Sequence, residues 1–157
     1  MHEINANINA SASAIGDRIA LRGLVDQYAL AVDARDGEQF ARLFTADGVL
    51  QGFELDGAEP IMRYAGYAEL RNVIGERASR FMRTFHVIAN HTCELDGDEA
   101  AGVAYCMAHH LSEPDGILVD TVMLIRYHDR YRRVDSTWRI SQRDAIRHWS
   151  TTANAQR

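Results

Sequence analysis

The chain changes its character at Phe81, and this change restricts the folds that are open to it. From this residue onward, long strand-forming stretches alternate with short polar turns. The expected strands are 82–95, 101–112, 117–132 and 137–149, and Asp96-Gly97-Asp98 between the first two is a strong hairpin signal. Helices followed by a meander of strands are typical of an α+β fold. We expect a strongly curved antiparallel sheet that forms a cone around N-terminal helices and encloses an apolar pocket.

The helical signals lie in the first 80 residues. One apolar stripe predicts a helix from about residue 14 to residue 35 and consists of Leu21, Val25, Tyr28 and Val32. Asp36 is the expected N-cap of a short second helix, with Gln39 at its third position and Phe44 on its inner face. After short strands at about 49–55 and 61–64, a third helix is expected at about 67–80.

A chain of 157 residues has the length of one domain, expected at 14–150 between a loose leader (1–13) and a tail (151–157). The net charge is −5 and no basic run is longer than Arg132-Arg133. We therefore expect no nucleic-acid partner, since binding phosphates needs a clustered positive face. The sequence shows neither a membrane span of roughly 20 apolar residues nor a signal-peptide pattern, so we expect a cytoplasmic protein. Cys93 and Cys106 lack metal-ligand spacing and are expected to be free, buried thiols.

A carboxylate and a histidine far apart in the sequence are the candidate acid–base pair. Asp33 ends the first expected helix within an apolar stretch, and His86 lies in the first long strand. The negative end of the helix dipole disfavours a carboxylate there, and this favours a functional interpretation of Asp33 over a solvent-facing one. If the sheet closes over the helix, the two side chains come within hydrogen-bond distance. The alternative for His86 is a structural histidine that bridges strand and helix.

These residues belong to a wider pattern that runs from about Ile15 to Trp149. It comprises Asp33 in residues 31–36, Phe40-Ala41-Arg42-Leu43-Phe44 with Asp47-Gly48, Thr84-Phe85-His86, and Trp138 to Arg143. With it, the chain resembles the SnoaL-like branch of the nuclear transport factor 2-like (cone-fold) superfamily, and in particular its scytalone dehydratase, lindane dehydrochlorinase and bile acid 7α-dehydratase members. The resemblance implies the cone fold, and it places Arg143 where the dehydrochlorinase-like members carry a catalytic arginine. The fold alone does not define an activity.

A His/Asp pair without a nucleophile suits removal of a proton from carbon, followed by loss of a leaving group. Histidine can take a proton near neutral pH, and a carboxylate on its second nitrogen fixes the tautomer and stabilises the imidazolium. No GxSxG motif is present. We therefore expect a cofactor-independent lyase, a dehydratase or a related enzyme, acting on a small, mostly apolar cyclic molecule without a metal. The alternatives are an isomerase or polyketide cyclase with the same base, or a non-catalytic ligand-binding or assembly subunit.

Three more residues are candidates for the catalytic site. Tyr28 could hydrogen-bond a carbonyl or enolate oxygen, or it is an ordinary buried aromatic. Arg143 could hold a leaving group or an enolate, or it is an exposed strand cation. A two-residue hairpin loop would pair His86 with His109, which would place His109 in the pocket and His110 outside it. A register change of one residue would exchange these two histidines.

Apolar residues on the presumed inner faces define the expected substrate pocket, and they are Leu24, Phe53, Ile88, Met107, Val119 and Met123. The outer face of the strands carries Val87, Val122 and Leu124. Because this is much apolar surface for an exposed sheet, we expect a homo-oligomer, either a dimer or a trimer, that is joined through this face.

Overall fold

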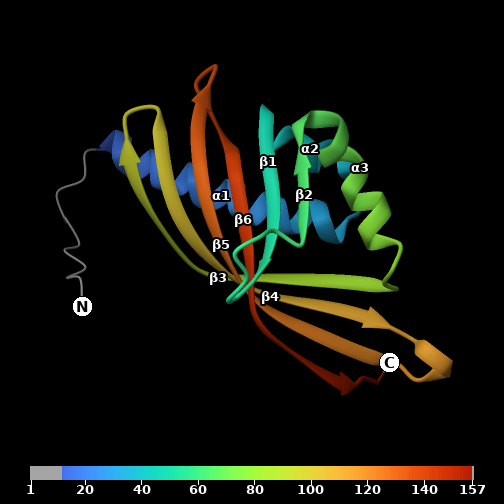
Figure 1. The fold of residues 1–157 in the computed structure, drawn as a ribbon. Coiled ribbons are helices and arrows are strands. Elements are labelled where there is room, and N and C mark those ends of the chain that lie inside the picture. The colour runs from blue at the N-terminus through green and yellow to red at the C-terminus, as the bar shows by residue number, and fades with distance from the viewer. Residues whose placement is uncertain (1–11, 157) are drawn as a thin grey trace.

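Six strands form one curved sheet around three helices in the computed structural model, which describes residues 12–156 (Figure 1). The helices are α1 (Ala12–Asp33), α2 (Gly37–Arg42) and α3 (Gly66–Ala78). The strands are β1 (Phe44–Glu54), β2 (Met62–Ala65), β3 (Arg83–Asp96), β4 (Glu99–Ser112), β5 (Val119–Val134) and β6 (Thr137–Asn154), and a short 3-10 helix, η1 (Pro114–Gly116), joins β4 to β5.

The strands lie in the order β2-β1-β6-β5-β4-β3. Neighbouring strands are antiparallel except β1 and β6, which run parallel. The sheet is therefore mixed, where a purely antiparallel one was expected. The parallel pair arises because the chain passes through β2 and α3 after β1, and the last strand then returns beside β1. The predicted α+β class and the curved cone are confirmed, and the sheet is not closed.

The boundary between the first two helices follows from local geometry. Arg35 adopts a left-handed conformation with φ of 58°, and the backbone N–H of Asp36 donates to the carbonyl of Ala31 at 2.9 Å. This is the pattern of a helix C-terminus, so α1 ends beside Asp33. Asp36 then caps α2, since its carboxylate accepts the backbone N–H of Gln39 at 2.9 Å, as the sequence predicted.

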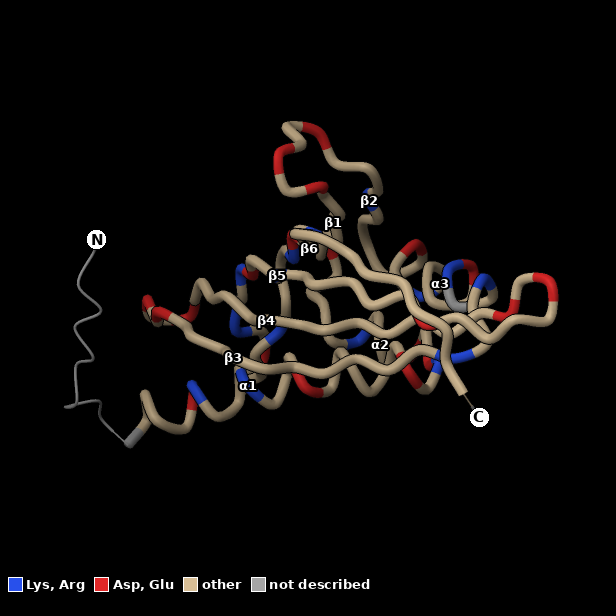
Figure 2. The backbone as a smooth tube through the Cα atoms, turned by 90° about the horizontal axis from the view of Figure 1, so that it is seen from below, with Lys and Arg blue, Asp and Glu red and all other residues tan. Residues whose placement is uncertain are grey.

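Helix α1 lies along β3, the strand at one edge of the sheet (Figure 2). The guanidinium of Arg22 donates to the carbonyl oxygens of Ala89 and Ile88 at 2.8 and 3.2 Å, and Arg18 donates to the carbonyl of Cys93. Because an edge strand presents unpaired carbonyl groups, these arginines cover an otherwise open edge. They also join the helix that carries Asp33 to the strand that carries His86.

A β-bulge in β3 changes how this strand pairs with β4. Two residues of β3 between Ile88 and His91 oppose a single residue of β4. On the hairpin side of the bulge the register is the one expected from the sequence. On the far side it has moved by one residue, so that His86 pairs with Ala108 and not with His109. Such a shift inverts which side chains of β4 share the face of His86.

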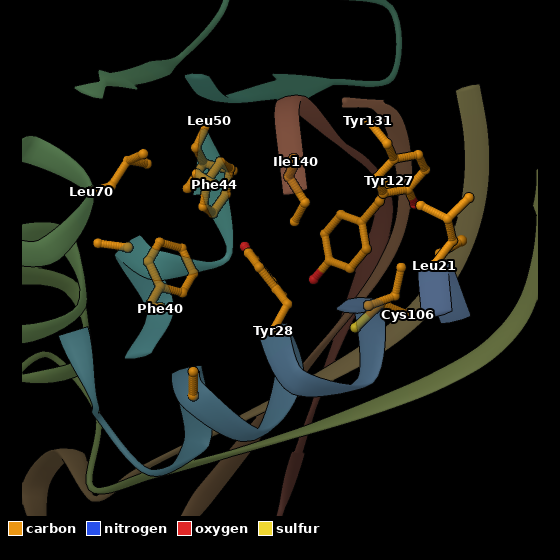
Figure 3. Close-up of a cluster of buried hydrophobic side chains, with 14 of the residues drawn as sticks. Leu21, Tyr28, Phe40, Phe44, Leu50, Leu70, Cys106, Tyr127, Tyr131 and Ile140 are labelled. Atoms are coloured by element: carbon orange, nitrogen blue, oxygen red, sulfur yellow. The ribbon is translucent and has the colours of Figure 1, made fainter. Parts of the chain in front are cut away.

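The core fills the space between α1, α2 and the concave face of the sheet (Figure 3). The predicted stripe of α1 is confirmed there, since Leu21, Val25 and Tyr28 are buried and Val32 packs against them. The ring of Tyr28 lies 5.0 Å from that of Phe40, measured between centroids. Cys93 and Cys106 are buried free thiols, as expected. Phe44 is also buried, but it belongs to β1 and not to the short helix.

At the two ends of the chain, most of the predicted leader, residues 1–11, lies outside the described residues. Strand β6 continues to Asn154, past the predicted end at Trp149, because residues 150–154 pair with the first five residues of β5. Across residues 12–156, none of the helices has the length and apolar character to cross a membrane.

Candidate active site

A cavity of about 140 Å³ lies between the helices and the concave face of the sheet. Its walls are mostly apolar and include Val32, Phe40, Leu50, Val73, Ile74, Phe81, Met123 and Ile125. The polar groups that reach it belong to Tyr28, Thr84, His86, His110, Arg77 and Tyr127. A concave apolar site with few polar groups is typical of small-molecule binding.

Asp33 and His86 meet at the wall of this cavity. The Oδ1 atom of Asp33 accepts hydrogen bonds from the ring Nδ1 of His86 at 2.7 Å and from the hydroxyl of Thr84 at 2.8 Å. Its Oδ2 atom accepts a hydrogen bond from the backbone N–H of His86 at 2.8 Å. The hydrogen bond expected from the sequence is therefore present. An ionised carboxylate only accepts, so in the neutral imidazole Nδ1 carries the hydrogen and Nε2 has the free lone pair. The sequence analysis did not identify Thr84 as a site residue. It lies two positions before His86, and therefore on the same face of the strand, which was the available signal.

The Asp33 carboxyl is stabilised in its ionised form. Burial disfavours the charge, but the hydrogen bonds from His86 and Thr84 outweigh burial and lower the pKa of Asp33 below the ordinary carboxyl value. These three donors also offset the unfavourable position of Asp33 at the C-terminal end of α1. Asp33 is consequently a carboxylate at neutral pH and can compensate a positive charge on His86.

The second histidine of the cavity is His110, which corrects the expectation that His109 faces the pocket. The His110 ring lies edge to face with that of His86, with 5.8 Å between the centroids, and its Nδ1 lies 3.0 Å from the carbonyl of Ala108. His109 is on the opposite face of the sheet, where its Nδ1 lies 2.7 Å from Oδ2 of Asp120. The bulge in β3 is the cause, because it moves the register by one residue. Burial, followed by the charge of His86, lowers the pKa of His110, which is therefore neutral at pH 7.

Arg143 is fully buried beneath Tyr28 and does not line the cavity. Its Nε and Nη2 donate to the two carboxylate oxygens of Asp129 at 2.7 and 2.6 Å. Its guanidinium carbon lies 4.0 Å from the ring centroid of Tyr28 and 4.2 Å from that of Tyr127. The interpretation of Arg143 as an exposed strand cation is therefore wrong. The expectation that its guanidinium contacts the cavity directly is also wrong. Arg143 reaches the site through Tyr28.

Tyr28 does line the cavity, and burial raises the pKa of its hydroxyl above the ordinary phenol value. It is therefore a hydrogen-bond donor throughout the neutral pH range. No sequence pattern pointed to the other polar residues that are buried around Arg143. There the hydroxyl of Tyr131 donates to Asp129 at 2.6 Å, and Nε2 of His91 lies 3.3 Å from the same hydroxyl.

Of the six residues expected in the pocket, Met123 lines the cavity. Leu24 and Ile88 pack against the core but do not line the cavity. Met107 lies on the outer face of the sheet, because it shares the alternation of His109 and the same bulge turns it outward.

Phe53 and Val119 do not line the cavity either. In β1 the even-numbered positions such as Leu50 and Gly52 face inward, so Phe53 faces away. Val119 is the first residue of β5, four positions before Met123, at the far end of the strand. As for metals, no three His, Cys, Asp or Glu side chains within residues 12–156 are placed to bind one together.

A curved sheet that wraps around N-terminal helices and an apolar cavity defines a protein of the cone-fold class. The SnoaL-like domain model matches residues 13–144, and the chain belongs to that family. A curated relative, the uncharacterized protein Rv2910c of Mycobacterium tuberculosis (strain ATCC 25618 / H37Rv), is 25% identical over 133 residues, which are 85% of this chain and 86% of the relative.

Solved structures of the same fold include enzymes. A hexachlorocyclohexane dehydrochlorinase (LinA) type 2 superposes with a TM-score of 0.75 at 18% identity, over 88% of this chain and 90% of its own. A protein of Novosphingobium aromaticivorans DSM 12444, provisionally named a scytalone dehydratase, also gives a TM-score of 0.75 at 18% identity, over 90% of this chain and 91% of its own. At these identities the likeness shows the fold alone.

Proposed function

We propose that this protein is a cofactor-independent lyase that eliminates a leaving group from a small, mostly apolar cyclic molecule. The observation that carries the proposal is the Asp33–His86 hydrogen bond of 2.7 Å at the wall of an apolar cavity. The likeness of the fold to a dehydrochlorinase and to a protein provisionally named a dehydratase supports the same class of reaction.

His86 is the general base. Its Nε2 lone pair takes a proton from a ring carbon of the substrate, and the electron pair left on carbon forms the new double bond as the leaving group departs with its own pair. Asp33 keeps Nδ1 protonated and compensates the charge of the imidazolium that forms. The imidazolium can return its proton to a departing hydroxide, which then leaves as water.

Tyr28 and His110 act on the substrate beside this base. The Tyr28 hydroxyl donates a hydrogen bond to an oxygen on which negative charge develops. Arg143 stabilises that phenol from beneath the ring and is a positioning residue. His110 takes the place first assigned to His109, next to the base and in reach of the leaving group. The same residues could also catalyse an isomerisation, which needs the base without a leaving group.

An assembly subunit of the same fold is the main alternative from another class. The cavity and the orientation of the His–Asp pair favour an enzyme over that alternative. In a protein with only structural partners, side chains would fill this volume, and both nitrogens of His86 would have internal partners. No hydrogen bond of His86 Nε2 is found within residues 12–156.

The test is an untargeted screen of a metabolite mixture with the purified protein, with His86→Ala as the matched control. We expect at least one small cyclic compound to be consumed by the wild-type protein and to be unchanged by the variant. The product should be lighter by the mass of the leaving group plus one proton. Equal consumption by both proteins would contradict the proposal. A product of unchanged mass would favour the isomerase.

A further inference from the structure

One positive charge stands at the cavity, and it belongs to Arg77 near the C-terminal end of α3. Among the residues that line the cavity, Arg77 is the one Arg, Lys, Asp or Glu side chain. It is exposed, so it lies where the cavity meets solvent. Phe81 and Thr84, which follow shortly after it, are also lining residues.

Arg77 is one of several arginines within residues 12–156 that have no carboxylate partner, and it is the one among them that lines the cavity. All 17 basic residues of the chain are arginines. Those with ion pairs to carboxylates are Arg22, Arg42, Arg71, Arg132, Arg133, Arg143 and Arg147. Even Arg71, on the same helix, pairs with Glu38 at 3.0 Å. Within residues 12–156, no carboxylate lies within ion-pair distance of Arg77.

The surroundings of Arg77 add to its positive charge. Arg80 and Arg83 lie in the link from α3 to β3 and at the start of β3, and neither has an ion pair within the described part of the chain. Figure 2 shows both basic and acidic positions around α3, while the tips of the loops between strands carry acidic residues. A chain of net charge −5 thus keeps uncompensated positive charge beside its cavity. The charge of Arg77 also contributes, after burial and His86, to the lowered pKa of His110.

The volume of the cavity limits the apolar part of the ligand. An apolar protein cavity of about 150 Å³ is known to hold one benzene molecule. At about 140 Å³, this cavity fits one six-membered ring, and a substituent on that ring would extend past Arg77 into solvent.

We infer that the substrate is an anion, a single apolar ring with a carboxylate substituent that pairs with the Arg77 guanidinium at the cavity entrance. The planar guanidinium suits bidentate binding of a carboxylate. Arg77 would be a binding and specificity residue, remote from the carbon that loses its proton to His86. This inference rests on the proposed function for the use of the site, but the charge preference can be measured without turnover.

The experiment compares two probes of the same shape, 1-cyclohexenecarboxylate and the uncharged 1-cyclohexenecarboxamide. Their affinities are measured by calorimetry on the full-length protein at low salt, with Arg77→Gln as the test variant and Arg80→Gln as the matched control. We expect the carboxylate to bind the wild-type protein and Arg80→Gln about tenfold more tightly than the amide, as a charge-assisted hydrogen bond provides. The preference should disappear in Arg77→Gln and weaken in high salt.

Equal affinities for the two probes, no binding of either probe, or a preference that survives in Arg77→Gln would overturn the inference. Failure of the inferred carboxylate site can be distinguished from failure of the proposed lyase function. His86→Ala should keep the preference for the carboxylate, since binding needs no base. A charge preference without any turnover would leave the anion site standing and remove the lyase.

Discussion

His110 and His86 lie edge to face on the concave side of the sheet, with 5.8 Å between their ring centroids. This relationship exists because the bulge in β3 shifts the pairing with β4 by one residue. It places a neutral, half-buried imidazole beside the candidate base, and it makes His110 a group whose protonation works against folding.

Protonation of His110 gives the first prediction, which concerns stability against pH. The pKa of His110 is lowered in the folded protein, chiefly by burial, from about 6.5 in the unfolded chain. The folded state therefore binds its proton more weakly, so the stability present above pH 6.5 is lost as the pH falls through the folded value. We expect the free energy of unfolding to decrease from pH 7.5 to pH 5, and to decrease less in His110→Gln.

Urea denaturation at several pH values measures this slope. The pKa of His91 is also lowered by burial, so the remaining slope should shrink again in the double variant with His91→Gln. The same slope in the wild-type protein and in His110→Gln would contradict the assigned position of His110.

The second prediction concerns the His–Asp pair. Once a substrate is known, His86→Ala should lower kcat by roughly 10²–10⁴-fold with the fold intact, as loss of a general base does. Asp33→Asn should be nearly as damaging, because an amide does not stabilise the imidazolium and can select the wrong tautomer. The decisive comparison is turnover against melting temperature for both variants. If turnover falls only in proportion to stability, the pair is structural.

Arg143 and Asp129 give the third prediction, since both side chains are fully excluded from solvent. Arg143→Ala should destabilise the protein by about 3–5 kcal/mol, because it leaves the Asp129 carboxylate buried without its partner. Arg143→Lys should also be damaging, since an ammonium cannot reproduce the two parallel hydrogen bonds. Chemical denaturation checks both values. The double variant Arg143→Met/Asp129→Leu should recover much of the loss, and a loss equal to the sum of the single variants would refute the coupling.

The fourth prediction is a homo-oligomer joined through the outer face of the sheet. Besides the expected Val87, Val122 and Leu124, this face carries Phe85 and Trp149, which are 65% and 59% exposed. Light scattering at micromolar concentration should give a multiple of the 17.7 kDa chain mass. Trp149→Arg should shift the mass toward the monomer, whereas Ile19→Arg on α1, also at an exposed position, should not. A wild-type mass near 18 kDa would defeat this prediction.

The order of the elements and the candidate base could both be predicted from the amino-acid sequence. Apolar periodicity marked the buried stripe of α1, the Asp36 and Gln39 pair marked the cap of α2, and Asp96 to Asp98 marked the hairpin. These signals are local, because capping, turns and alternation depend on residues a few positions apart. Asp33 and His86 could be predicted as site residues for another reason. A carboxylate at a helix C-terminus and a histidine in an apolar strand are both unusual in their own surroundings.

Which residues share the cavity with that pair could not be predicted, because it depends on how the strands pair in three dimensions. The bulge between Ile88 and His91 leaves no clear mark in the sequence, yet it exchanges His109 for His110 and turns Met107 outward. The partner of Arg143 was equally hidden, because the bond to Asp129 depends on the pairing of β5 with β6. Alternation has a period of two residues, so one inserted residue reverses every side chain beyond it. Which side chains meet is therefore fixed by register and long-range packing, which local patterns do not encode.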